Sequence, residues 1–149
     1  MDIVLFQPQI PQNTGNIVRT CSVTGATLTL IEPLGFSTND RWLKRAGLDY
    51  WEGVRVEKKP DLESYLLETG RPFYFLTSKT TRTIWDVSFE ANSHLVFGSE
   101  TSGLPKALME KYEDRLVTIP MIEGARCLNL ATSVGIALYT GLKNLQVRS

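Results

Sequence analysis

The sequence predicts an α/β protein, with a mostly parallel sheet that carries helices on both faces. Short β-branched and aromatic runs alternate with stretches whose apolar residues recur at helical spacing, which is the order of elements that such a sheet requires. A length of 149 residues suits one continuous hydrophobic core, so we expect a single domain over residues 1–149. No repeat or low-complexity tract interrupts the pattern.

Each expected strand is a short apolar run bounded by turn-forming residues. The expected strands are 3–6, 27–31, 54–56, 73–76, 95–97 and 116–119. The expected helices lie between and after them, at 14–24, 41–46, 61–68, 105–112 and 128–145. Asn13 or Thr14 can cap the first helix, and Pro105 suits a helix start because proline lacks the N–H that such a start leaves unbonded.

The last expected helix has a continuous apolar stripe along one side. Its members recur at helical spacing: Leu130, Val134, Ala137, Leu138, Gly141 and Leu145. Ala131, Ile136 and Leu142 widen the apolar surface beyond this stripe. The pattern fits a helix buried in the core, and it also fits a helix that serves both the core and a subunit interface.

Charge and composition exclude several classes of protein. Sixteen Lys plus Arg balance sixteen Asp plus Glu, so a nucleic acid would have to be bound by a local patch. Such a patch is predicted at Arg41, Lys44, Arg45, Arg55, Lys58 and Lys59, although a solvated helix face explains this cluster about equally well. In a dimer, two copies of the patch would join Arg19, Lys79 and Arg82 in one basic groove.

Targeting and metal signals are missing from the sequence. No apolar run approaches the ~18 residues of a membrane span, and the N-terminus does not resemble a signal peptide. We therefore expect a cytoplasmic protein with no membrane partner. Cys21 and Cys127 match neither a CxxC pair nor a zinc spacing, so we expect no metal.

Three polar segments follow expected strands, where parallel sheets bind their ligands. They cover 7–16, 97–105 and 119–130. Their candidate functional residues are Asn13 and Arg19, Glu100, and Asn129. Each also has a purely structural explanation: the two asparagines as helix caps, Arg19 as a surface residue and Glu100 as a turn residue.

Two other chemistries find little support. Gly98 and Gly103 have the spacing of a Walker motif, but Leu104-Pro105 stand where that motif needs Lys-Ser/Thr, which argues against a phosphate-binding switch. His94 has no Gly-x-Ser-x-Gly nucleophile to serve, so we expect a structural histidine.

Taken in order, the three segments resemble the three motifs of the SPOUT superfamily of knotted RNA methyltransferases, in its ribose 2'-O-methylating (SpoU/TrmH-type) branch. The matching stretches are Asn13-x-Gly15-x-x-x-Arg19, Phe97-Gly98-x-Glu100-x-x-Gly103-Leu104, and Ile119-Pro120-Met121 with Leu128-Asn129-Leu130. The resemblance covers essentially the whole chain and extends to the single-domain TrmL-type enzymes, which methylate the wobble ribose of certain tRNAs. Two positions depart from the pattern, because Cys127 stands where the family usually has serine and Thr140 where glutamate is common.

The resemblance implies S-adenosylmethionine as methyl donor, a C-terminal trefoil knot, a homodimer with active sites at its interface, and the tRNA anticodon stem-loop as partner. The implied cofactor contacts are Leu76, Gly98, Ile119, Met121, Cys127 and Leu128, and the implied polar active-site residues are Asn13, Arg19, Glu100 and Asn129. Arg19 stays protonated, so it would hold a phosphate or the ribose oxygen. A substrate phosphate or Glu100 would take the proton, unless Glu100 instead organises its loop.

We therefore expect a tRNA 2'-O-ribose methyltransferase that acts at the wobble nucleotide, position 34, on cytidine or a modified uridine. Two alternatives stay open. One is the same chemistry on ribosomal RNA or at another tRNA position. The other is a non-catalytic RNA-binding module of the same fold, for which Cys127 is the best support.

Overall fold

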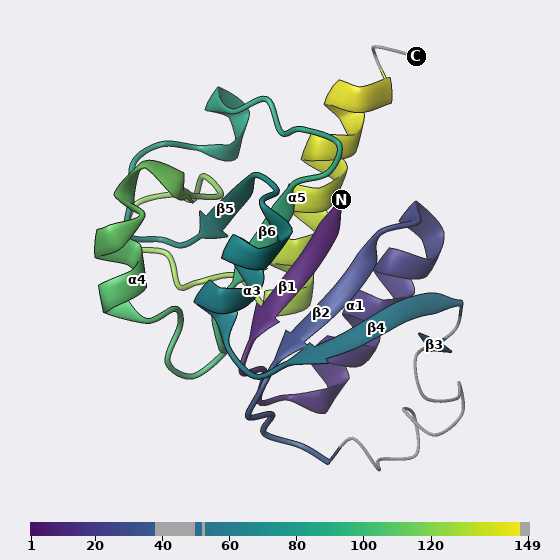
Figure 1. Cartoon of the computed structure of the whole chain (residues 1–149). Helices are drawn as coiled ribbons and strands as arrows, with labels where there is room; N and C mark the ends of the chain where they lie inside the picture. Colours follow the sequence, from purple (N-terminus) through teal and green to yellow (C-terminus); the bar gives the residue numbers. More distant parts are fainter. Residues whose placement is uncertain (38–49, 52, 147–149) are drawn as a thin grey trace.

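The computed structural model describes residues 1–37, 50–51 and 53–146 (Figure 1). Within these residues the chain forms a seven-stranded sheet of order β3-β4-β2-β1-β6-β5-β7. Strand β3 pairs antiparallel with β4, whereas the pairings of the other strands are parallel. The predicted α/β fold with a mostly parallel sheet is confirmed.

The strands are β1 (Asp2–Phe6), β2 (Thr27–Ile31), β3 (Tyr50–Trp51), β4 (Val54–Lys59), β5 (Phe73–Leu76), β6 (His94–Phe97) and β7 (Leu116–Val117). The helices are α1 (Pro11–Thr24), α3 (Leu62–Thr69), α4 (Lys106–Lys111) and α5 (Leu130–Gln146), with short 3₁₀ turns at η1 (Ile84–Asp86) and η2 (Glu113–Arg115). None of the helices in these described ranges combines the length and apolar character that a membrane span requires.

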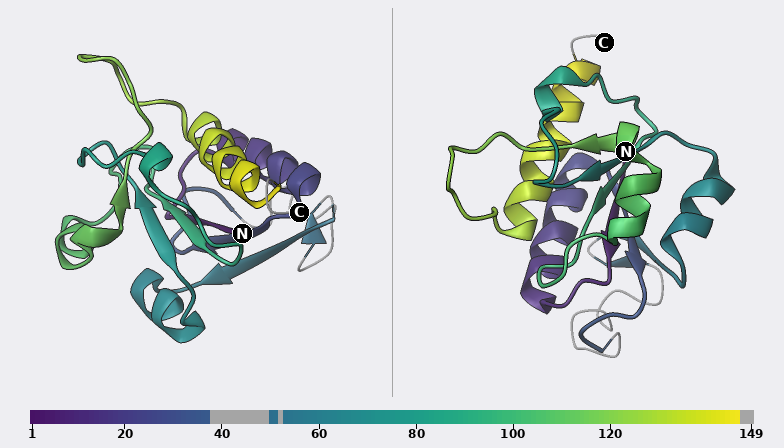
Figure 2. Two further views of the ribbon diagram at one scale, coloured as in Figure 1. Left: turned by 90° about the horizontal axis from the view of Figure 1, so that it is seen from above. Right: turned by 90° about the vertical axis from the view of Figure 1, so that its left-hand side faces the viewer.

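Two apolar layers enclose the sheet, one on each face. Helices α1 and α5 lie side by side over one face, and α3 and α4 cover the other (Figure 2). Strand β1 shows how the chain fills both layers, because Ile3 and Leu5 point to the α1/α5 side and Val4 to the opposite side. The predicted stripe on the last helix lies in the core, since Val134, Ala137 and Leu138 are fully buried.

Most predicted elements are present, with shifted ends. Helix α1 begins at Pro11, three residues before its expected start, because proline fits the first helical turn and Ile10 already has the extended backbone of an N-cap residue. The prediction that Asn13 or Thr14 caps this helix is therefore wrong: both residues lie inside its first turn. Strand β7 ends at Val117, short of the expected residue 119. The expected helix 41–46, with Arg41, Lys44 and Arg45, lies outside the described residues.

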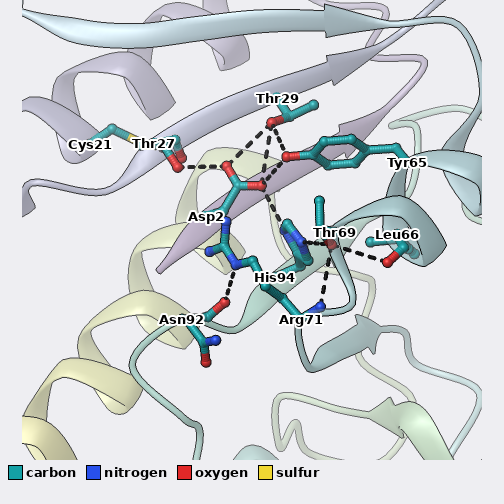
Figure 3. A network of polar contacts seen from close by, with 10 residues as sticks. All are labelled: Asp2, Cys21, Thr27, Thr29, Tyr65, Leu66, Thr69, Arg71, Asn92 and His94. Atoms are coloured by element: carbon teal, nitrogen blue, oxygen red, sulfur yellow. Dashed lines mark hydrogen bonds and ion pairs between the residues drawn. The ribbon is translucent and has the colours of Figure 1, made fainter.

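His94 belongs to a buried polar network at the amino ends of the strands, as expected of a structural histidine (Figure 3). Its Nδ1 lies 2.7 Å from Oδ2 of Asp2, and its Nε2 lies 2.8 Å from the hydroxyl of Thr69. Asp2 also accepts hydrogen bonds from Thr27 (2.7 Å) and Tyr65 (2.9 Å). Burial, followed by the charge of Asp2, raises the pKa of Tyr65 to about 12. The Asp2 carboxylate thus joins β1, β2, β6 and α3.

Replacing Asp2 by alanine should lower the free energy of unfolding by about 3–5 kcal/mol, because it leaves several buried polar groups without their shared acceptor. Urea denaturation measures this change. Asp114→Ala is the matched control: its side chain is 82% exposed, so we expect a change below about 0.5 kcal/mol. A loss of less than about 1 kcal/mol in Asp2→Ala would show that the network is dispensable.

Candidate active site

The three predicted polar segments meet around one cavity of about 520 Å³ at the carboxyl ends of the strands. This volume lies in the range of small-molecule sites. All six expected cofactor positions line it: Leu76, Gly98, Ile119, Met121, Cys127 and Leu128. Asn13, Glu100 and Asn129 line the same cavity, so the fold brings together nine of the ten residues that the resemblance singled out.

The Glu100 side chain holds the segment that follows β1 against the loop that follows β6. Its Oε1 accepts the backbone N–H of Gln9 (2.9 Å), and its Oε2 accepts the backbone N–H of Ile10 (2.9 Å) and the amide of Asn13 (3.1 Å). Ile10 is the N-cap residue of α1 and has no side-chain cap of its own. The carboxylate therefore satisfies the open helix start from another part of the chain, where negative charge is favoured.

Hydrogen bonding keeps Glu100 ionised. Burial raises the pKa of its carboxyl group, but the backbone N–H groups of Gln9 and Ile10 and the Asn13 amide outweigh burial, and the net pKa is lowered. A carboxylate with a lowered pKa, whose oxygens already accept three N–H groups, is a poor proton acceptor for a substrate hydroxyl. The geometry favours an organising role for Glu100.

Asn13 and Asn129 extend this contact to the third segment. The Asn129 amide donates to Oδ1 of Asn13 (3.0 Å), while Oδ1 of Asn129 accepts the N–H groups of Ala131 (2.9 Å) and Thr132 (3.3 Å). The expected capping of the last helix by Asn129 is thus confirmed, and the same side chain also contacts the site. Each amide nitrogen retains a second N–H for a ligand oxygen.

Gly98 is required by close packing in the loop after β6. A Cβ at this position would lie 2.4 Å from the carbonyl carbon of Gly103 and 2.5 Å from the nitrogen of Leu104. Ser99 and Gly103 also pair as an isolated bridge. The loop is therefore folded back on itself, which directs Glu100 toward α1.

Arg19 is the one candidate that the structure places elsewhere. It lies on α1, six residues beyond Asn13, and is exposed without lining the cavity. At about 100° per residue, a separation of six positions turns a side chain to a different side of the helix. The spacing that suggested a shared site therefore separates Arg19 and Asn13 within one chain.

The loop between β7 and α5 projects from the body of the protein (Figure 2). It contains exposed apolar side chains at Met121, Ile122 and Leu128, and Ile122 is 84% exposed. Ile136 and Tyr139 on α5 are also exposed. Cys127 is exposed in the same loop, whereas Cys21 is buried and its pKa is raised to about 12 by burial.

Sequence reasoning missed the backbone contributions of Gln9 and Ile10, because backbone N–H groups have no side-chain signature. It also missed Ser99 and Ser133, which line the cavity. Among the residues that the structure describes, no three His, Cys, Asp or Glu side chains are grouped so that they could hold a metal ion.

Comparison with known proteins gives consistent matches. A model of the SpoU rRNA Methylase family matches residues 1–139. A Geobacillus stearothermophilus protein, provisionally named a tRNA (cytidine(34)-2'-O)-methyltransferase, is 46% identical over 96% of this chain and 94% of its own length. The Aeromonas hydrophila tRNA (cytidine(34)-2'-O)-methyltransferase is 44% identical over 97% of this chain and 94% of its own length. A solved structure described as giving structural insights into the 2-OH methylation of C/U34 on tRNA is 37% identical to this chain. It matches 99% of this chain and 97% of its own chain, with a TM-score of 0.86.

Protonation of Glu100 should destabilise the protein in acid. Because folding lowers its pKa below the ordinary value of 4.5, its contribution is present above that pH and is lost as the pH falls through the folded-state pKa. Glu100→Gln should be about 1–2 kcal/mol less stable than the wild type at neutral pH, and this difference in stability should shrink as the pH falls below 4.5. Urea unfolding of both proteins at a series of pH values measures this difference in stability. A constant difference at all pH values would contradict the role of the charge.

Proposed function

The chain belongs to the SpoU rRNA methylase family, and from this membership we propose that it methylates the ribose 2'-hydroxyl of the wobble nucleotide of tRNA, position 34. The observation that supports this function best is the convergence of all three motifs on one cavity. The family alone leaves the RNA open, whereas the relatives at 44–46% identity carry names that specify cytidine 34 of tRNA.

S-adenosylmethionine is the proposed methyl donor, and the cavity fits it. Leu76, Ile119 and Leu128 offer apolar surface for a flat adenine ring, and Asn13 and Asn129 offer polar groups beside it. When bound, this molecule supplies an electrophilic methyl group on a sulfonium centre. A nearby ionised Glu100 makes the local charge favourable for a positive ligand.

The proposed roles of the polar residues follow from their contacts. Glu100 fixes the start of α1, and through it Asn13, so that the two asparagine amides have a set position in the cavity. Their remaining N–H groups orient a ribose oxygen, which is the positioning that methyl transfer requires. Arg19 is permanently charged and stabilises negative charge on the reacting oxygen or an adjacent phosphate. The proton leaves to a substrate phosphate.

A homodimer with active sites at its interface explains two further observations. Exposed apolar side chains lie on the loop after β7 and on α5, next to the cavity, and a second copy would bury them. Arg19 does not line the cavity of its own chain, so we propose that it completes the cavity of the partner. We further propose that the chain forms a C-terminal trefoil knot, that it binds the anticodon stem-loop of tRNA and that it is cytoplasmic.

Isotope-labelled S-adenosylmethionine tests the function directly. Incubation with tRNA that lacks wobble ribose methylation, and separately with ribosomal RNA, should give labelled 2'-O-methylcytidine or a 2'-O-methyluridine derivative only at position 34 of the tRNA, identified by nucleoside mass analysis. Arg19→Ala should lower turnover at least about 100-fold while the dissociation constant of the cofactor stays within about twofold. Label only in ribosomal RNA or at another tRNA position would replace the proposed substrate, and no label despite cofactor binding would favour a non-catalytic module.

Mixing two inactive variants tests the shared site. In the proposed dimer each site combines Asn129 of one subunit with Arg19 of its partner, so Arg19→Ala and Asn129→Ala disable different halves of a site. Half of the dimers in a co-refolded mixture should be heterodimers, each with one intact site of two. The mixture should therefore recover up to about a quarter of wild-type turnover. Neither variant alone, nor each refolded with itself, should recover activity. Absence of recovery from a mixture that forms dimers would place Arg19 and Asn129 in the same subunit's site.

A further inference from the structure

The segment that follows β2 contacts the segment that follows β1 at Gly35. The backbone N–H of Gly35 donates to the carbonyl of Pro8 (2.9 Å). A Cβ at Gly35 would lie 2.7 Å from Cα of Gln9 and 2.3 Å from its Oε1. The side-chain oxygen can rotate away, but the backbone of Gln9 can give way only if the whole segment moves.

Space, not backbone conformation, is what requires glycine here. The φ angle of Gly35 lies outside the left-handed region, so an alanine could adopt the same backbone angles. Ordinary contact of a Cβ begins at about 3.4 Å, so alanine would push the backbone of Gln9 away by several tenths of an ångström.

Gln9 is the residue through which such a movement would reach the cavity. Its backbone N–H donates to Glu100, next to the N–H of Ile10 that binds the same carboxylate. Its side-chain amide donates to the carbonyl of Gln7 (2.8 Å), and Gln7 has a φ of 47°, which is unusual for a residue with a side chain. The segment 7–10 is therefore held on one side by Gly35 and on the other by Glu100.

We propose that Gly35 is a positioning residue for methyl transfer. By allowing close approach, it holds Pro8 and Gln9 where Glu100 can accept both backbone N–H groups together with the Asn13 amide. Gly35 does not line the cavity, and it acts through Gln9 and Glu100. This inference rests on the proposed function for its kinetic consequence, whereas its geometric part stands independently.

Gly35→Ala tests the inference, with Glu32→Ala as the control from the same segment, since Glu32 is exposed. In Gly35→Ala we expect kcat for methyl transfer to tRNA to fall about 100-fold, because small misplacements at a reacting centre have effects of this size. The dissociation constant for S-adenosylmethionine should stay within about twofold, and the far-ultraviolet circular dichroism should be unchanged. Glu32→Ala should keep wild-type kcat.

A double-mutant cycle shows whether Gly35 acts through Glu100. In the Glu100→Gln background, Gly35→Ala should cost less than about threefold in kcat, because the contact it supports is already lost. The positioning role would be overturned if the two substitutions lowered kcat additively. It would also be overturned if Gly35→Ala lowered the affinity for S-adenosylmethionine as much as it lowers kcat.

Amide NMR distinguishes failure of this inference from failure of the proposed function. The Gln9 and Ile10 amide resonances should shift and exchange faster with solvent in Gly35→Ala, and should be unchanged in Glu32→Ala. If wild-type protein does not methylate tRNA but these amides respond as expected, the function is wrong and the geometric role stands. If the amides do not respond, the positioning role is wrong whatever the activity.

Discussion

The organisation of the candidate site depends on one carboxylate that accepts three N–H groups. Glu100 belongs to the loop after β6, and its partners Gln9, Ile10 and Asn13 belong to the segment that leads from β1 into α1. Parallel pairing of β1 and β6 brings the two loops to the same edge of the sheet. Ionised Glu100 then fixes their relative position, and Asn13 passes that position on to Asn129 at the start of α5. Three segments that are distant in sequence thus form one cavity.

A second carboxylate serves the opposite end of the sheet. Asp2 binds His94, Thr27 and Tyr65 at the amino ends of the strands, where the network is buried and contributes to stability. Glu100 lies at the carboxyl ends, where the cavity opens and its contacts position residues for a ligand. The separation is physically useful, because the stability network can stay closed to solvent while the site stays accessible.

The sequence predicts much of this fold, since strands β2 and β5 coincide with their apolar runs and every described helix of two or more turns was expected. It also identified Glu100 and Asn129, but only the order of the three motifs gave them a shared role. The function of the Gln9 and Ile10 amides could not be predicted, because backbone groups are the same in every residue. Gly35 was missed for a related reason: the approach of two loops is a tertiary event with no local pattern. Arg19 shows a different limit: its motif predicts a role in the site, but the motif does not say whether Arg19 reaches the cavity of its own chain, which the structure shows it does not line.

A crystal structure with S-adenosylhomocysteine, the product of the proposed donor, would show whether Glu100 organises the site while the cofactor cavity is occupied. We expect this ligand in the cavity between Gly98, Ile119 and Leu128, with Glu100 still bound to the N–H groups of Gln9 and Ile10 and to Asn13. A ligand bound elsewhere would contradict the organising role of Glu100, and so would a Glu100 side chain that leaves α1 and turns toward the position of the reacting hydroxyl as a base.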